Sequence, residues 1–313
     1  MSKKIIVTVC SINYLGQAKA LAESAVKHNP DYKVVIGLVD RIDGRIDTSG
    51  YSPHRLLEVH EMNLPVFQEM YERYNLLELN CALKSYFVSW AMDEYQPDHV
   101  IYLDADMMVH ASLSPIEELL KENSILITPH ITKPFPKDGR RPAENDILKT
   151  GMYNAGFYAV KNDKDGMALI EWWKDRMIDQ GYERPKDGLN CDQNWLNFAP
   201  LYFRKVLNVD HPGCNVAYWN FHEKMIVQSG EKVMVNGQAL LVFHYSGYSL
   251  REPTKISRHQ TRYEMNGNPA IAKLFKDYEA ILVKNGHEDL QKIQCYYKKE
   301  SGGKWLKKLG IKR

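Results

Sequence analysis

Short apolar runs alternate along this chain with longer segments in which apolar residues recur every three or four positions. The first run covers residues 5–9, and apolar positions over 14–28 then fall on one helical stripe. Asn29 and Pro30 end that stripe, and a second apolar run covers 34–39. This strand–helix–strand order predicts a parallel sheet with a right-handed crossover.

The alternation continues through most of the remaining sequence. We expect a helix to begin at Ser114, strands at 100–103, 125–127, 154–160 and 240–243, and helices at 80–94, 166–178, 192–198 and 270–283. Residues 129–146 hold four prolines and predict a long surface loop, either a binding loop or a solvated insertion. The pattern therefore predicts an α/β fold with a mostly parallel sheet flanked by helices.

Composition narrows the class of protein. A chain of 313 residues with 44% hydrophobic content fits one large globular α/β domain with additions, or two small ones. A net charge of +2 gives no basic field of the kind that nucleic acid binding needs. The five cysteines are scattered without a Cys-x-x-Cys pair, which favours reduced thiols over disulfides or a zinc site.

Targeting signals are not visible in the sequence. The first apolar run is too short for a signal peptide, and no segment approaches the roughly 18 apolar residues of a transmembrane helix. We therefore expect a cytoplasmic protein.

Two aspartates, Asp104 and Asp106, follow the apolar run at 100–103. In an extended backbone, residues two apart share a face, so both carboxylates can point at one spot. Such a pair suits Mg²⁺ or Mn²⁺, and open α/β sheets bind ligands where their strands end. A solvated acidic turn is the alternative, but the apolar residues on both sides make unpaired carboxylates costly.

Two later positions have residue types that suit the same site. His244 follows the expected late strand, where it is either a nitrogen ligand for Mn²⁺ or an ordinary polar residue. Asp192, followed by Gln193, begins a short helix. Its carboxylate either stabilises the helix start or serves a substrate as general base or anchor for sugar hydroxyls.

Further polar residues stand at the starts and ends of expected elements. Asn154 and Gly156 suit a hydrogen-bonding residue and a close-approach glycine beside a ligand, or simply a strand start. Lys84, on the helix before the aspartates, can reach a phosphate or stay solvated. Asn13 and Tyr14, after the first strand, can hold and stack on a base or merely cap the next helix.

The order of these positions is more specific than any one of them. In chain order they are Asn13 and Tyr14, Lys84, Asp104 and Asp106, Asn154 and Gly156, Asp192 and Gln193, and His244 with Gly247. Over about residues 5–250 the chain resembles the GT-A glycosyltransferases, and among them the family 8-like bacterial enzymes that build surface glycans. The resemblance implies a mixed, mostly parallel sheet, a catalytic domain over 1–250 and a helical extension over 251–313.

The resemblance also implies roles for these residues. Asp104 and Asp106, with Ala105 between them, and His244 are expected to hold Mn²⁺ or Mg²⁺ against the diphosphate of a nucleotide sugar. The turn at residues 13–14 is expected to bind the uracil and ribose of a UDP-sugar.

The donor sugar and the reacting carbon are expected to lie among Asn154, Gly156, Asp192 and Gln193. Asp192 and Gln193 are the implied catalytic residues, and Lys84 is implied to touch the donor.

Two departures from the family pattern are visible. The family continues after His-x-x-Gly with a Lys-Pro-Trp-like segment, whereas this chain has Gly247 followed by a segment in which Arg251 is the substitute. The first turn lacks the acidic residue often found there. Residues 215–220 look like a block of bacterial relatives, for which we expect a place on the acceptor side.

The predicted function is metal-dependent transfer of a sugar from a UDP-sugar to a glycan or lipid-linked acceptor in bacterial surface polysaccharide synthesis, with retention. A sugar nucleotidyltransferase of the same fold would usually carry a glycine-rich signature after the first strand, which this chain lacks. A binding module of the same fold without turnover is the second alternative.

The last stretch differs in composition from the rest. From Lys292 onward seven lysines and Arg313 stand among aromatic and aliphatic residues, with Glu300 as the single acid. This suits an anionic membrane surface, and a frayed, solvated tail is the alternative. The expected location is the cytoplasm, with peripheral attachment to the inner face of the plasma membrane.

Overall fold

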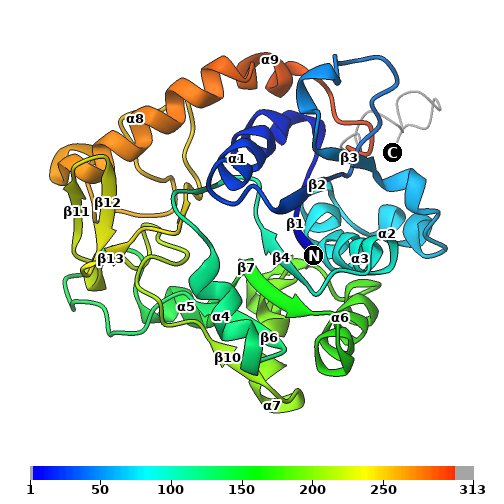
Figure 1. The fold of residues 1–313 in the computed structure, drawn as a ribbon, viewed down its shortest axis with the longest axis horizontal. Coiled ribbons are helices and arrows are strands. Elements are labelled where there is room, and N and C mark those ends of the chain that lie inside the picture. Colours follow the sequence, from blue (N-terminus) through cyan, green and yellow to red (C-terminus); the bar gives the residue numbers. More distant parts are fainter. Residues whose placement is uncertain (1–2, 300–313) are drawn as a thin grey trace, which may run out of the picture.

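A seven-stranded sheet forms the centre of the computed structural model, which describes residues 3–299 (Figure 1). From edge to edge its strands are β10 (Val206–Asn208), β6 (Ile125–Pro129), β7 (Tyr153–Lys161), β4 (His99–Leu103), β1 (Lys4–Cys10), β2 (Tyr32–Leu38) and β3 (Arg55–Glu58). β7 runs antiparallel to both neighbours, and every other neighbouring pair is parallel. The predicted mixed, mostly parallel sheet is confirmed.

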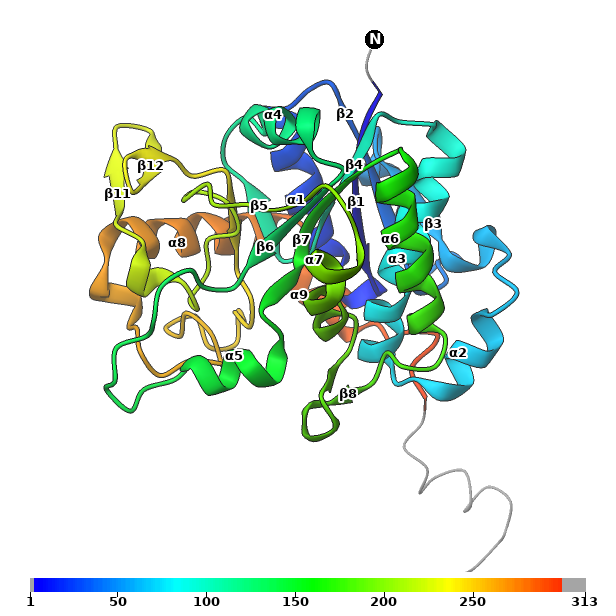
Figure 2. The same ribbon diagram turned by 90° about the horizontal axis from the view of Figure 1, so that it is seen from below.

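Helices cover both faces of this sheet. α3 (Leu76–Tyr95) and α6 (Lys164–Met177) lie on one face, and α1 (Leu15–His28) and α4 (Ser114–Glu122) lie on the other (Figure 2). In β1, Val7 packs towards the first pair and Ile6 towards the second. Strands buried on both faces read as continuous apolar runs, which is why β1, β2 and β4 are visible in the sequence.

Smaller strands build the remaining sheets. β5 (Met107–Val109) pairs antiparallel with β14 (Val242–His244), β11 (Ile226–Ser229), β12 (Lys232–Val235) and β13 (Gln238–Ala239) form a meander, and β8 (Glu183–Arg184) pairs with β9 (Leu189–Asn190). Of these, only β14 overlaps an expected strand, at 240–243. Strands of two to four residues are too short to show periodicity.

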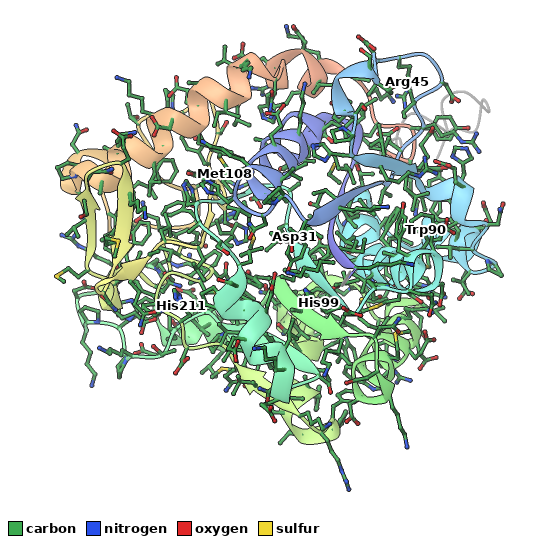
Figure 3. The ribbon with its side chains drawn as sticks, viewed as in Figure 1. Asp31, Arg45, Trp90, His99, Met108 and His211 are labelled. Atoms are coloured by element: carbon green, nitrogen blue, oxygen red, sulfur yellow. The ribbon has the colours of Figure 1, made fainter. Side chains whose placement is uncertain are left out.

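Five further helices complete the described chain: α2 (Phe67–Arg73), α5 (Glu144–Thr150), α7 (Ala199–Tyr202), α8 (Pro269–Lys284) and α9 (His287–Lys292). α8 packs through Phe275 and Tyr278 against Tyr245, which follows β14 (Figure 1). These residues form a hydrophobic core beside the meander, in addition to the two cores on the faces of the central sheet. Side chains fill the space between these layers, including Met108 of β5 (Figure 3).

Several boundaries differ from the sequence prediction. α3 begins at Leu76 rather than near residue 80, because Asn75 and Glu78 form a reciprocal capping box. The expected helix at 192–198 is a 3-10 segment over Gln193–Phe198 that leads into α7. The expected loop at 129–146 is confirmed up to the start of α5 at Glu144.

The predicted basic tail lies largely outside the described residues, because 300–313 are not described. Among the residues that are described, no helix is both long and apolar enough to cross a membrane.

Candidate functional site

Asp104 and Asp106 lie in a tight turn immediately after β4. The Asp104 N–H donates to the Gly156 carbonyl at 2.8 Å, and the Met107 N–H donates to the Asp104 carbonyl at 3.0 Å. The pair is therefore not extended, and our reason for expecting the carboxylates on one face was wrong. They converge because the turn folds the chain back into β5.

His244 is brought to this turn by strand pairing. In the β14–β5 ladder His244 stands opposite Met107, the residue next to Asp106. The His244 Nε2 lies 3.0 Å from the Asp106 Oδ1. Burial disfavours the charge on Asp106, but His244, a backbone hydrogen bond and Lys84 together hold the pKa of that carboxyl below its usual value. The ligand atoms of Asp104, Asp106 and His244 all lie within 4.8 Å of one another.

Lys84 connects this cluster to Asp192. Its Nζ lies 2.8 Å from the Asp104 Oδ1 and 3.5 Å from the Asp192 Oδ2. Burial opposes the lysine charge, yet the two carboxylates hold the pKa of Lys84 well above its usual value. Burial also raises the pKa of Asp192 to about 6, although Lys84 acts against that rise. Lys84 is therefore engaged by carboxylates rather than free for a phosphate.

Gln193 is fixed by hydrogen bonds at both ends of its amide. Its Nε2 donates to the Thr150 carbonyl at 2.7 Å, and its Oε1 accepts from the Asn154 Nδ2 at 3.0 Å and from the Ala155 N–H at 3.2 Å. A carbonyl oxygen can only accept, so the Thr150 contact sets the orientation of the whole amide. The side chain is preorganised beside the start of β7.

Asn154 links Gln193 to the far wall of the site. Its Oδ1 accepts from the Gly156 N–H at 3.2 Å and from the Asn215 Nδ2 at 3.1 Å. Asn215 begins the block 215–220, and the Val216 carbonyl accepts the His244 N–H at 2.9 Å. That block is therefore packed between β7 and β14, directly beside the cluster.

His130 and Trp219 form one wall of the site. Trp219 belongs to the block 215–220, which we expected on the acceptor side, whereas sequence reasoning did not assign His130. The Trp219 ring lies edge-on to both His130, at 5.2 Å, and His244, at 5.1 Å. Burial lowers the pKa of His130 to about 4, so the ring is neutral at physiological pH. Its Nδ1 lies 2.8 Å from the Gly151 carbonyl and must carry the proton. A single histidine in a proline-rich loop gave no signal for this role.

Gly156 leaves the space that a bound group would need. A Cβ at this position would lie 2.6 Å from the Asp104 Oδ2, 2.7 Å from the Asn154 Oδ1 and 2.9 Å from the His244 Cε1. The missing side chain thus keeps a small cradle open among two oxygens and an imidazole. The donor set and the cradle both fit a divalent cation such as Mn²⁺.

Tyr218, Arg258 and His259 lie on the outer rim of the site. The Tyr218 ring stacks near-parallel with His259 at 6.4 Å and meets Trp219 edge-on at 5.0 Å. Burial raises the pKa of Tyr14 and of Tyr218, the Asp106 charge adds to both rises, and the Arg258 guanidinium opposes both. The Arg258 cation and the Asp106 carboxylate therefore act, with opposite sign, on the same two tyrosines.

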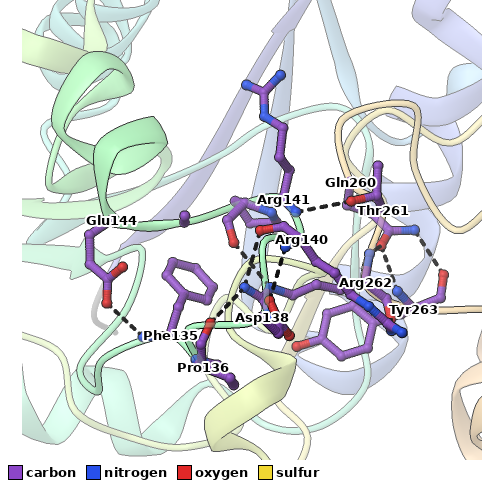
Figure 4. A network of polar contacts seen from close by, with 12 residues as sticks. Phe135, Pro136, Asp138, Arg140, Arg141, Glu144, Gln260, Thr261, Arg262 and Tyr263 are labelled. Carbon is purple, nitrogen blue, oxygen red and sulfur yellow. Dashed lines mark hydrogen bonds and ion pairs between the residues drawn. The ribbon is translucent and has the colours of Figure 1, made fainter.

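A buried arginine ties this rim to the loop before α5 (Figure 4). The Arg262 side chain pairs with Asp138 at 2.5 Å and donates to the carbonyls of Pro136, Arg140 and Pro142 at 3.3, 3.2 and 3.0 Å. The Thr261 N–H donates to the Arg141 carbonyl at 2.9 Å, and the Arg141 N–H donates to the Thr261 Oγ1 at 2.9 Å, which completes the junction. We call this junction, residues 135–144 with 260–263, the Arg262 clasp.

The remaining expected residues fall at different distances from the cluster. The Asp106 charge contributes to the raised pKa of Tyr14. The Asn13 Oδ1 accepts a hydrogen bond from the Cys295 thiol at 3.2 Å. At Gly247 a Cβ would lie 2.6 Å from the Ser257 Oγ, so residues 257–259 pack over it. Arg251 lines a pocket of about 340 Å³ with Gly247, Arg258 and other polar residues, but it is exposed and makes no contact with the cluster among the described residues.

Comparisons with known proteins agree with this fold. No family model matches the sequence. Two proteins of Bacillus subtilis (strain 168), both named as uncharacterized, are similar to it. YfnF is 27% identical over 262 residues, covering 81% of this chain and 85% of its own, and YfnD is 22% identical over 250 residues, covering 78% and 77%.

Among solved structures, the galactosyltransferase LgtC in complex with donor and acceptor sugar analogues has a TM-score of 0.54 at 17% identity, covering 97% of this chain and 99% of its own. An active-site mutant of LgtC gives 0.54 at 18% identity, with coverage of 88% and 95%. The structural neighbours are thus family 8-like glycosyltransferases, and the predicted resemblance is confirmed at the level of the fold.

Proposed function

We propose that this protein is a metal-dependent glycosyltransferase that moves a sugar from a UDP-sugar to a hydroxyl group of a glycan or lipid-linked acceptor, in the synthesis of bacterial surface polysaccharide. One observation carries the proposal. The ligand atoms of Asp104, Asp106 and His244 lie within 4.8 Å of one another at the carboxyl edge of the sheet, and Gly156 keeps space open beside Asp104 and His244. In open α/β sheets that edge is the usual place for a nucleotide.

Asp104, Asp106 and His244 would hold Mn²⁺ or Mg²⁺ in this proposal. A bound cation would offset the negative charge that develops on the departing diphosphate. The site keeps a net negative charge that a cation can balance, because Lys84 neutralises only part of the charge on Asp104, Asp106 and Asp192.

Gln193 and Asn154 are proposed to orient the donor sugar. Their amides are fixed by mutual hydrogen bonds, so little side-chain freedom would be lost when a sugar binds. Asp192 lies next to Gln193, but its side chain is almost fully buried against Lys84. That burial favours a retaining reaction, in which Asp192 and Gln193 stabilise the reacting carbon and the leaving phosphate takes the proton from the acceptor.

Arg258 is proposed to meet the departing diphosphate. The resemblance suggested Arg251 for this task, but the charge of Arg258 acts on Tyr14 and Tyr218, the two tyrosines on which the Asp106 charge also acts. A guanidinium suits phosphate oxygens because it donates two parallel hydrogen bonds. Arg251 remains a second candidate, because it lines the same pocket.

The acceptor is proposed to bind against the outer rim. Tyr218 is half-buried, and the charges of Arg258 and of the Arg141–Asp146 ion pair, whose atoms are 2.6 Å apart, both act on the pKa of its hydroxyl group. Aromatic faces with a few fixed polar groups are typical of pockets that bind small polar ligands. We propose residues 1–250 as the catalytic domain and 251–313 as an extension whose basic end binds an anionic membrane.

Calorimetric titration of UDP tests the donor and the metal site together. We expect binding that requires Mn²⁺, is lost with EDTA, and is lost in Asp106→Ala. Asp277→Ala is a matched control, because Asp277 is an exposed aspartate paired with Lys273 on α8. Absence of UDP binding in the wild type under all these conditions would contradict the uridine assignment.

Donor turnover separates an enzyme from a binding module. We expect slow release of free sugar from a UDP-sugar without acceptor, and we expect Asp104→Ala to remove it. A protein that binds UDP with Mn²⁺ but hydrolyses none of a broad panel of UDP-sugars would favour a binding module of the same fold.

A further inference from the structure

The chain returns to the first turn after α9. Residues 294–297, which we call the strap, run beside the turn that holds Asn13, although the two segments are 282 residues apart at their closest hydrogen bond. Cys295 is buried there, and its Sγ donates to the Asn13 Oδ1 at 3.2 Å. Figure 3 labels Arg45, which donates a hydrogen bond to Gln294, the first residue of the strap.

Asp40 binds the strap and the first turn at the same time. Asp40 lies two residues after the end of β2 and is fully buried. One carboxylate oxygen accepts the Ile12 N–H at 3.2 Å, and the other accepts the Tyr296 N–H at 2.9 Å and the Arg45 Nη2 at 2.6 Å. A buried carboxylate with four donors is well compensated, so the strap completes the hydrogen bonding of Asp40.

Further contacts hold both ends of the strap. The Arg45 Nη1 donates to the Gln294 carbonyl at 2.8 Å. The Tyr296 ring lies under the Arg41 guanidinium at 5.3 Å, and the Tyr297 ring meets Phe67 edge-on at 5.0 Å. The strap thus contacts the segment after β2 and the first residue of α2.

The strap orients the side-chain amide of Asn13. Its Oδ1 is occupied by the Cys295 thiol, whereas its Nδ2 makes no hydrogen bond to any described residue. The free amide nitrogen can only donate. Asn13 is therefore suited to an oxygen acceptor, such as a base carbonyl or a ribose hydroxyl oxygen.

We propose that the strap is a working part of the nucleoside end of the donor site, in which Cys295 and Asp40 are positioning residues that hold Asn13 as a hydrogen-bond donor to the nucleoside. The proposal rests on the proposed function, because it assumes that a nucleoside diphosphate binds beside the first turn. It adds that this binding depends on a segment of the C-terminal extension.

The test compares two ligands that differ only in the nucleoside. Calorimetry would measure the binding of UDP and of inorganic pyrophosphate, each with Mn²⁺, to the full-length protein. In Cys295→Ala we expect UDP affinity to fall about three- to tenfold, the effect of one lost hydrogen bond, with pyrophosphate affinity unchanged. Cys295→Ser keeps a donor and should restore most of the UDP affinity.

Two further variants make the comparison specific. In an Asn13→Ala background, Cys295→Ala should cause no additional loss, because the two residues act through one hydrogen bond. Cys214→Ala removes another buried thiol, which lies in the core near β14, and should leave both affinities unchanged.

Hydrogen exchange gives an independent readout of the same strap. UDP with Mn²⁺ should slow amide exchange in a peptide that covers residues 293–299, whereas pyrophosphate with Mn²⁺ should not. The proposal is overturned if Cys295→Ala binds UDP like the wild type, if it loses UDP and pyrophosphate equally, or if UDP leaves this exchange unchanged. A wild type that binds UDP in these cases leaves the proposed function intact, and a wild type that binds no nucleoside diphosphate overturns both.

Discussion

Lys84 and Asp104 form a nearly buried ion pair in which the Nζ and Oδ1 atoms are 2.8 Å apart, and the same ammonium group also faces Asp192 at 3.5 Å. Replacing Lys84 with Met would leave two carboxylates near the core without their cation. We expect a loss of about 3 kcal/mol in the free energy of unfolding, together with loss of turnover.

Added Mn²⁺ should recover part of that stability, because a cation held by Asp104 would replace the lost positive charge. Urea unfolding of Lys84→Met with Mn²⁺ and with EDTA measures this. Lys121→Met is the control, because Lys121 pairs with Glu118 on the exposed side of α4 and should change little. Equal stability of Lys84→Met in both conditions would count against a metal at Asp104.

Gly156→Ala should close the cradle. The new methyl group would lie 2.6 to 2.9 Å from atoms of Asp104, Asn154 and His244, so these side chains would have to move. We expect at least about a tenfold loss in Mn²⁺ affinity and about 1–3 kcal/mol in stability. Gly267→Ala is the matched control, because a Cβ there has no neighbour within 4 Å.

Gln193→Glu should turn a donated hydrogen bond into a repulsion. The amide Nε2 now donates to the Thr150 carbonyl at 2.7 Å, and a carboxylate oxygen there would face another oxygen. We expect a lower kcat, measured by steady-state kinetics, and a free energy of unfolding about 1–3 kcal/mol lower, measured by urea unfolding.

Gln228→Glu provides the comparison for that variant. The Gln228 Nε2 also donates to a carbonyl, that of Gly230 at 2.7 Å, but it does so on the exposed meander. Its stability should stay within about 0.5 kcal/mol of the wild type, because water can replace the lost bond. A similar small effect in Gln193→Glu would contradict the rigid arrangement described for the site.

Stability should fall as the pH is lowered from about 6.5 towards 4. Burial lowers the pKa of His130 to about 4 in the folded protein, whereas an unfolded histidine takes up a proton near pH 6.5. Below that pH the unfolded state therefore binds more protons, and the folded state loses stability until its own pKa is reached.

The His130 contribution amounts to about 3 kcal/mol over that window, at 1.36 kcal/mol for each unit of pKa difference. His130→Gln should flatten the dependence by this amount, as measured by urea unfolding between pH 7.5 and 4.5. His60→Gln is the comparison variant, because His60 is an exposed histidine two residues after β3 and its replacement removes no buried ring. If His130→Gln showed the same pH dependence of the free energy of unfolding as the wild type, the buried ring would not be the source of that dependence.

Arg258 and Arg251 can be separated by paired variants. We expect Arg258→Ala to weaken UDP binding about tenfold and to reduce its dependence on salt, because it removes a cation whose charge acts on Tyr14 and Tyr218, as the Asp106 charge does. Arg251→Ala should have a smaller effect, since its side chain is exposed and makes no contact with the cluster among the described residues. The opposite ranking would return the diphosphate contact to Arg251.

The buried strands and the residues that follow them could be predicted from the sequence. β1, β2 and β4 lie between two layers of helices and are apolar on both faces, so Asp104, Asp106 and Asn13 stood out where they end. His244 was expected near the aspartates because it follows a late apolar run. That expectation agrees with the observed distance of 3.0 Å to Asp106.

Residues that reach the site through irregular segments could not be predicted. Arg258 and His259 lie in a stretch without helix or strand, and their position depends on how that stretch packs over Gly247. His130 and Cys295 are single residues whose partners are distant in sequence. Periodicity carries no information about such contacts, because it reports only local burial.

The Arg262 clasp makes two surface loops a single unit for protein engineering. Arg262 donates to three carbonyls of the loop before α5 and pairs with Asp138, so a change in either loop alters contacts that the other makes (Figure 4). A chimera that takes residues 135–144 from a relative would therefore have to take residues 260–263 from the same source. Libraries that vary the acceptor rim should vary both segments as one cassette.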